Sequence, residues 1–229
     1  MLKNNMIIAV VLIVLSFDIV LSFQPQTTEE LQTAVDIWVD DNETALATYG
    51  EINTWDVSLI TNMYALFTDK ETFNDDISNW DVSSVMETAY MFWGANSFNQ
   101  DLSGWDVSGA IYMNSMFGNA TSFNQDLSGW DVSSVINMNS MFGHATNFNS
   151  DLSDWDVSSV TTMSLMFSHA DSFNSDISDW DVSSVIDISN MFQSADIFNQ
   201  DISGWDVSSV TNIKGMFSSA TSFNQDLSG

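Results

Sequence analysis

The chain has 229 residues, of which 45% are apolar and 13% aromatic, and this composition argues against intrinsic disorder despite the high charge. Three Lys and Arg residues stand against 31 Asp and Glu. The resulting formal net charge of −28 argues against nucleic acid and anionic lipid as partners, because their phosphates would be repelled. The absence of cysteine excludes disulfides, cysteine nucleophiles and cysteine-ligated zinc.

Residues 1–22 are predicted to be an export signal. A lysine near the start precedes the apolar run 6–15, and the small residues Val20 and Ser22 suit cleavage before Phe23. An uncleaved anchor is the alternative, because apolar residues continue almost to the cleavage site. No second apolar segment follows. We therefore expect a secreted or surface-held protein with no membrane insertion after signal removal.

Residues 23–50 are predicted to form a helical cap for the repeats that follow. Thr27 and Glu30 have the spacing of a capping box. A helical apolar face follows them, and Gly50 suits the end of the segment. Repeat arrays need such a terminal element, because an end coil has only one neighbour. The apolar face consists of Leu31, Ala34, Val35 and Trp38.

Seven near-copies of one 25-residue unit occupy residues 51–229. Starting at Trp130, one unit reads WDVSSVINMNSMFGHATNFNSDLSD. A constant period of this length predicts stacked repeats, each forming one coil. No cap follows the last repeat, which is consistent with a fragment, a covering partner chain or a frayed end. The tryptophans are at positions 55, 80, 105, 130, 155, 180 and 205.

Two apolar periodicities occur within each unit. Leu127, Trp130 and Val132 have the L-x-x-L-x-L spacing of a leucine-rich-repeat strand. The apolar residues of segment 135–145 recur at steps of three and four, as on a helix face. The sequence therefore predicts an α+β repeat solenoid of the leucine-rich-repeat type. Each of its seven coils would hold a short strand and a helix, behind the N-terminal helical cap.

The unit also resembles a known family. FNQDLSGWDVSSV and NMNSMF are similar to the BspA-like leucine-rich-repeat surface proteins and to the mycoplasma-type surface repeat of unknown function. The resemblance runs from Trp55 to the end of the chain, and residues 47–58 resemble lead-in segments of such proteins. It implies an exported, surface-displayed binding or adhesion protein. Lipid anchors and cell-wall signals, which many relatives carry, are not apparent.

Two columns of aspartate are candidates for cation binding. Neighbouring coils would place like carboxylates ~4.8 Å apart, where they repel by roughly 0.9 kcal/mol in water. We favour turns in which these carboxylates bond to the backbone. Calcium, which prefers oxygen ligands, is the alternative. The calcium candidates are Asp56, Asp81, Asp106, Asp131, Asp156, Asp181 and Asp206; the second column is Asp76, Asp101, Asp126, Asp151, Asp176, Asp201 and Asp226.

The asparagine and tryptophan columns have structural interpretations. An asparagine follows a phenylalanine in every repeat, from Asn74 to Asn224, and we expect a ladder of turns there. The tryptophans could be platforms for sugars, but their spacing favours the core. Trp93 and Tyr112 lie off these columns and are candidates for exposed contacts.

His144 and His169 occupy the same position in consecutive repeats, so we expect their side chains to be neighbours in the stack. A two-histidine metal site is the alternative to an exposed pair at a helix end. Asn42 and Asn119 begin glycosylation sequons, which matter only in a eukaryotic source.

No nucleophile–base constellation, phosphate loop or catalytic residue is apparent. The favoured hypothesis is a non-enzymatic secreted or surface binding module that presents an acidic repeat face to a protein or glycan at a cell surface or matrix. The alternative is a calcium-dependent structural or matrix protein. Ice or mineral binding is a third, weaker alternative.

Overall fold

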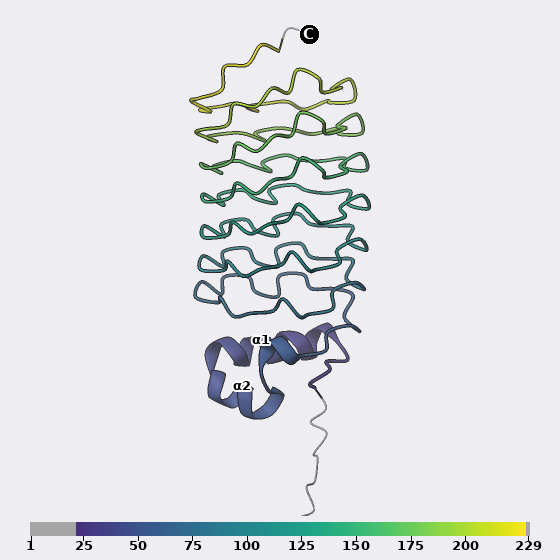
Figure 1. Cartoon of the computed structure of the whole chain (residues 1–229), viewed down its shortest axis with the longest axis vertical. Helices are drawn as coiled ribbons and strands as arrows, with labels where there is room; N and C mark the ends of the chain where they lie inside the picture. The colour runs from purple at the N-terminus through teal and green to yellow at the C-terminus, as the bar shows by residue number, and fades with distance from the viewer. Residues whose placement is uncertain (1–21, 228–229) are drawn as a thin grey trace, which may run out of the picture.

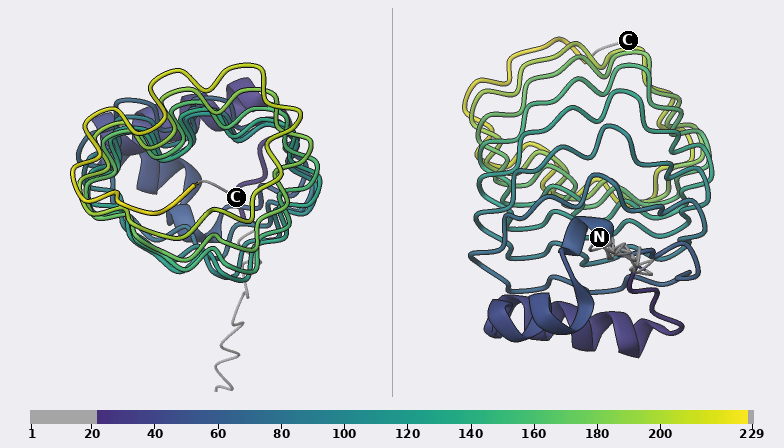
Figure 2. Two further views of the ribbon diagram at one scale, coloured as in Figure 1. Left: turned by 90° about the horizontal axis from the view of Figure 1, so that it is seen from above. Right: turned by 60° about the horizontal axis from the view of Figure 1, so that its bottom comes forward.

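The computed structural model describes residues 22–227, so all of the expected export signal except Ser22 lies outside the described residues. The 25-residue repeats stack as flat coils, with two helices against the first coil (Figure 1). Viewed along the stack, successive coils follow nearly the same outline (Figure 2). Neither helix in the described range is long and apolar enough to cross a bilayer.

Helix α1 (Thr28–Asp40) begins at the predicted capping box. The Thr27 hydroxyl accepts a hydrogen bond from the Glu30 N–H (3.2 Å), and the Glu30 carboxylate accepts one from the Gln26 N–H (2.7 Å). The predicted apolar face is buried, as expected for an amphipathic helix. It consists of Leu31, Ala34, Val35 and Trp38.

Helix α2 (Asn42–Tyr49) follows after a single residue. Asp41 ends α1 and caps α2, because its carboxylate accepts the Thr44 N–H (3.2 Å). Gly50 ends α2 with φ of 75°, a dihedral that glycine adopts at little cost. A short 3-10 helix, η1 (Ile52–Thr54), then leads into the first coil.

The predicted strand and helix of each coil are wrong. In the described part of the repeat region there is no α-helix, and parallel pairing is limited to single-residue bridges. At the expected strand, the Trp130 N–H donates to the Leu127 carbonyl (3.1 Å) and closes a turn. The bridges join Asn62, Glu87, Tyr112, Asn137, Thr162, Asp187 and Asn212 in sequence.

Alternating backbone amides bond within and between coils. The Ser140 N–H donates to Ser164 of the next coil (2.8 Å), and the Phe142 N–H to Met166 (3.0 Å). The intervening Met141 N–H instead closes a turn within its own coil. The same alternation recurs from coil to coil, so the segment expected to be helical is a chain of turns that pair with the neighbouring coil.

Left-handed residues explain why this segment cannot be a helix. Ser140 has φ of 54° and His144 has φ of 61°, which an α-helix of L-residues excludes. Each is the third residue of a turn that requires positive φ. Such turns return a side chain to the core every three or four residues, which mimics helical periodicity. The first left-handed column is Ala65, Tyr90, Ser115, Ser140, Leu165, Asn190 and Gly215; the second is Asp69, Gly94, Asn119, His144, His169, Ser194 and Ser219.

Columns of parallel aromatic rings fill the core. Phe142 stacks on Phe148 of its own coil at 3.8 Å and on Phe167 of the next coil at 5.8 Å. The repeat tryptophans are 2–8% exposed, which confirms that they belong to the core. The Trp130 indole N–H also donates to the Leu102 carbonyl in the preceding coil (3.0 Å). Burial of the ring therefore leaves no polar atom without a partner.

Candidate functional site

The aspartate beside each tryptophan is bound by its own turn. Asp131 accepts hydrogen bonds from the Ser133 N–H (3.0 Å) and hydroxyl (2.6 Å). The Ser133 hydroxyl and N–H together lower the pKa of Asp131. The backbone bond recurs in every member of the column: Asp56, Asp81, Asp106, Asp131, Asp156, Asp181 and Asp206.

The second aspartate column uses the same turn. Asp101 accepts the Ser103 N–H (2.9 Å), and this bond is the main cause of its lowered pKa. Burial and the charges of Asp126 and Asp76 oppose the shift, as expected for stacked carboxylates. No group of three or more potential metal ligands occurs among residues 22–227. The bonds from serine to aspartate in both columns are those expected of turns closed by a carboxylate.

The asparagine column forms the expected ladder between coils. The Asn124 side-chain oxygen accepts the Asn149 N–H at 2.8 Å. The same contact links each of the six consecutive pairs from Asn74 to Asn224, at 2.8–3.0 Å. These oxygens are therefore engaged in holding coils together.

The two histidines are neighbours, as predicted. The imidazoles of His144 and His169 stack at 4.4 Å with 8° between their planes. They occupy left-handed turn positions, so the expected helix end is wrong. Burial and then the nearby His169 lower the pKa of His144, while Asp171 opposes the shift.

The remaining candidates are dispersed. Asn42 is exposed at the start of α2, and Tyr112 is 40% exposed at a bridge position. Asn119 is half-buried in a left-handed turn. Trp93, Asn119 and His144 come together, however, because all three line one hollow in the side of the stack.

The hollow has a volume of about 270 Å³ and exists because two consecutive coils have glycine where other coils have side chains. The Trp93 indole lies against Gly118, where an added Cβ would be 2.8 Å from Trp93 Cδ1. Gly143, in the next coil, also lines the hollow, and an added Cβ there would lie 3.3 Å from the Leu165 carbonyl oxygen. The corresponding residues elsewhere are Thr68, Trp93 itself, Ser168, Gln193 and Ser218.

The hollow is lined by both polar and apolar side chains, with no carboxylate among them. Ser115 is 6% exposed and Ser168 is 2% exposed, and both line it. Neither hydroxyl has a hydrogen-bond partner in the described chain. Sequence reasoning identified Trp93 but missed the two serines and Gly143. The available signal was the pair of glycines at 25-residue spacing after Trp93.

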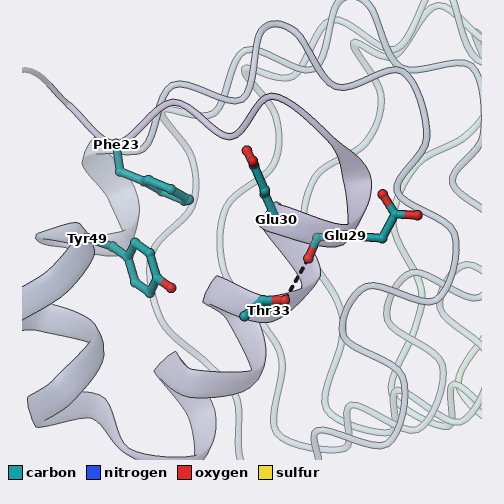
Figure 3. A pocket seen from close by; sticks show the side chains of 5 residues that line it. All are labelled: Phe23, Glu29, Glu30, Thr33 and Tyr49. Carbon is teal, nitrogen blue, oxygen red and sulfur yellow. Dashed lines mark hydrogen bonds between the residues drawn. The ribbon is translucent and has the colours of Figure 1, made fainter.

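A larger pocket of about 430 Å³ lies at the helical end (Figure 3). Phe23 and Tyr49 pair there, with ring centroids 4.5 Å apart. Thr33 donates to the Glu29 carbonyl of its own helix (2.8 Å), and the Glu30 carboxylate serves the capping box. The Glu30 carboxylate ties the segment before α1 to the helix, and this pocket, unlike the hollow, is lined by the carboxylates of Glu29 and Glu30.

Comparison with known proteins identifies the repeats. A family model described as "Mycoplasma protein of unknown function, DUF285" matches residues 39–155 and 138–229. The two matches overlap and include every coil. They confirm the broader part of the expected resemblance, a mycoplasma-type repeat of unknown function. Neither a curated protein nor a solved structure matches the chain.

Proposed function

Because the chain belongs to this family of mycoplasma-type repeat proteins of unknown function, we propose that it is a non-enzymatic binding or adhesion module. The module is secreted or displayed at a cell surface, and its partner is a protein or glycan. The expected export signal in residues 1–22 and the similarity to BspA-like surface repeats support this location.

The proposal rests on the contrast between constant and variable columns. Tryptophan, asparagine and both aspartate columns are identical in all seven repeats. The segments that carry the bridges and left-handed turns, which together we call the bridge wall, vary at every position except their core phenylalanine. One column of this wall, from Ala65 to Gly215, has six residue types. The bridge wall comprises residues 61–69, 86–94, 111–119, 136–144, 161–169, 186–194 and 211–219.

The charge of the bridge wall also supports contact with a partner. The wall contains only three acidic residues, Asp69, Glu87 and Asp187, in a chain of net charge −28. Its three central segments contain none. Exposed apolar side chains lie along it, including Met86 (48%), Ile136 (36%) and Ile186 (49%). Low charge and exposed apolar area favour contact, because little desolvation of charge is required.

The turns argue for binding rather than catalysis. The Asp131 carboxylate is already engaged by Ser133, and its lowered pKa makes it a poor general acid near neutral pH. The two histidines stack on each other and form no hydrogen bond with a hydroxyl nucleophile of the described chain.

The test uses residues 23–229 applied to an array of purified matrix proteins and glycans. Ile136→Asp places a charge in the bridge wall and should weaken binding about tenfold or more. Ser134→Asp is the matched control, because Ser134 is exposed just outside the wall and its substitution adds the same charge. The absence of any bound component, or equal loss in the two variants, would refute the proposal.

A further inference from the structure

We propose that the hollow between Trp93 and His144 binds one uncharged pyranose unit of a glycan. This inference rests on the proposed binding function and gives the bridge wall a ligand class. The hollow of about 270 Å³ is near the lower limit of small-molecule sites, roughly 300 Å³, so it suits a single sugar ring.

Trp93 supplies the apolar wall of the site. Its indole is half-buried against Gly118, and this backing fixes the ring before a ligand arrives. The C–H face of a pyranose packs well against such a ring, because the aromatic face is electron-rich. A preorganised ring loses little entropy on binding.

Two buried hydroxyls supply hydrogen-bonding capacity. Ser115 and Ser168 are more than nine-tenths buried and line the hollow without a protein partner. In the described chain no buried polar side-chain atom is both cut off from solvent and unpaired, so these oxygens reach the hollow. Because each hydroxyl is reachable from the hollow and makes no bond to the protein, it can donate to or accept from a ligand hydroxyl there.

Asn119 extends this capacity at the rim. Its side-chain amide makes no hydrogen bond within the described chain, and it offers both a donor and an acceptor. The Trp93 indole N–H is likewise unpaired and adds a donor. This mixture of donors and acceptors matches vicinal hydroxyls, which both donate and accept.

The electrostatics favour an uncharged ligand. No carboxylate and no cation lines the hollow, while the rest of the chain carries a net charge of −28. The surrounding negative potential opposes sialylated, sulfated or phosphorylated sugars. A cation would gain more at the aspartate columns than in the hollow.

The direct test is saturation-transfer NMR and calorimetry with methyl glycosides of glucose, galactose, mannose and N-acetylglucosamine, at up to ~20 mM. Sialic acid and glucuronate are the anionic comparisons. We expect saturable binding of at least one neutral glycoside and none of the acids. The absence of saturable binding by all four neutral glycosides, or equal binding of the acids, would overturn the inference.

Three variants locate the site. Trp93→Ala removes the platform, and Gly143→Ser fills the hollow with the residue that stands at position 168 in the next coil. Each should weaken neutral-sugar binding about tenfold or more. Leu59→Ala is the control, because Leu59 is an exposed apolar residue outside the bridge wall that does not line the hollow, and it should leave sugar binding unchanged.

Circular dichroism and melting temperature verify that each variant folds. If one variant unfolds, the other decides the result. Sugar binding that survives in a folded Trp93→Ala or Gly143→Ser protein would place the sugar elsewhere and refute the inference. Suppose that no sugar binds, but that a matrix protein binds the bridge wall and Ile136→Asp weakens this binding. The inference of a sugar site is then refuted, while the proposed binding function stands.

Discussion

At the scale of single residues, the repeated polar side chains mainly fix turns. The serine two residues after each aspartate donates a hydrogen bond to its carboxylate. The side-chain oxygen of each repeat asparagine accepts a hydrogen bond from the backbone of the next coil. These roles follow from the short side chains of Asp, Ser and Asn, which reach nearby backbone groups. They could therefore be predicted from sequence.

Ser133→Ala should raise the pKa of Asp131 toward its ordinary value, because it removes the hydroxyl that lowers it. Since the folded-state pKa is depressed, the turn stabilises the protein above the unfolded-state pKa of about 3.9 and loses that contribution as pH falls through the folded-state pKa. The variant should therefore be less stable than the wild type near pH 7 and equal to it in strong acid. Carbon-detected NMR titration and urea unfolding at several pH values measure both effects. An unchanged Asp131 titration would contradict the prediction.

The left-handed residues could not be predicted in the same way. Twelve of the fourteen left-handed positions in the coils are not glycine, so the usual compositional signal is absent. Tyr90 and Leu165 are unfavourable choices for positive φ, at 59° and 60°. Inter-coil hydrogen bonds, which are non-local, hold them in place.

Ala65→Gly should stabilise the protein by up to about 1 kcal/mol, because Ala65 has φ of 56° and glycine removes that strain. Ala47→Gly is the matched control. It lies exposed inside α2, where the same change should destabilise by about 1 kcal/mol. Midpoints of urea unfolding give both values. Destabilisation by both changes would show that Ala65 is unstrained.

At the scale of elements, helix α1 takes the place of a preceding coil beneath the first repeat. The Thr28 hydroxyl donates to the Asn62 carbonyl (3.0 Å), and the Gln32 amide donates to the Leu66 carbonyl (3.1 Å). In later coils the corresponding carbonyls accept backbone N–H groups from the preceding coil, as Glu87 does from Met63. Two side chains one turn apart thus satisfy carbonyls that would otherwise form an open edge.

Gln32→Ala should destabilise the first coil by about 1 kcal/mol, because the Leu66 carbonyl loses its donor. Hydrogen exchange should accelerate in residues 62–70 and remain unchanged in the middle coils. Thr33→Val is the control, since the Thr33 hydroxyl donates only to the Glu29 carbonyl within α1. Uniform acceleration along the stack would mean that α1 acts on global stability only.

The helical segment was predictable because its signals are local, whereas the coil was not. Thr27, Glu30 and Gly50 specify α1 and the end of α2 through contacts a few residues away. Within a coil, turns and helices share an apolar period near three and a half residues. Turns and helices differ in which carbonyl accepts each backbone N–H. In the coils that carbonyl can lie 24 residues away in the next coil, as when the Ser140 N–H donates to the Ser164 carbonyl.

At the scale of the whole molecule, two aspartate columns run along a stack with only one ion pair in the described residues, Lys70 with Asp36 (2.7 Å). Like charges in neighbouring coils repel, and this repulsion raises the pKa of Asp101 against the stronger effect of Ser103. The turns therefore bind each carboxylate without neutralising it. Screening by any salt should relieve the repulsion.

Sodium chloride should raise the melting temperature by roughly 2 °C or more, because it screens the columns. Millimolar calcium, compared with EDTA at equal ionic strength, should change it by less than about 1 °C, because the aspartates are already bonded to their turns. Differential scanning calorimetry measures the melting temperature with and without sodium chloride, and in calcium against EDTA. A calcium-specific rise of several degrees would favour the calcium-dependent alternative.

The alternating hydrogen bonds also have a mechanical consequence. Each coil is joined to the next by nearly the same set of bonds, as the Ser140–Ser164 and Phe142–Met166 contacts illustrate, and each coil has 25 residues. Tension applied to the two ends of the stack would detach coils one at a time, each releasing a tether of roughly 85 Å when fully extended. Under flow or shear, such a molecule would lengthen in equal steps at similar force and limit the load on whatever it holds.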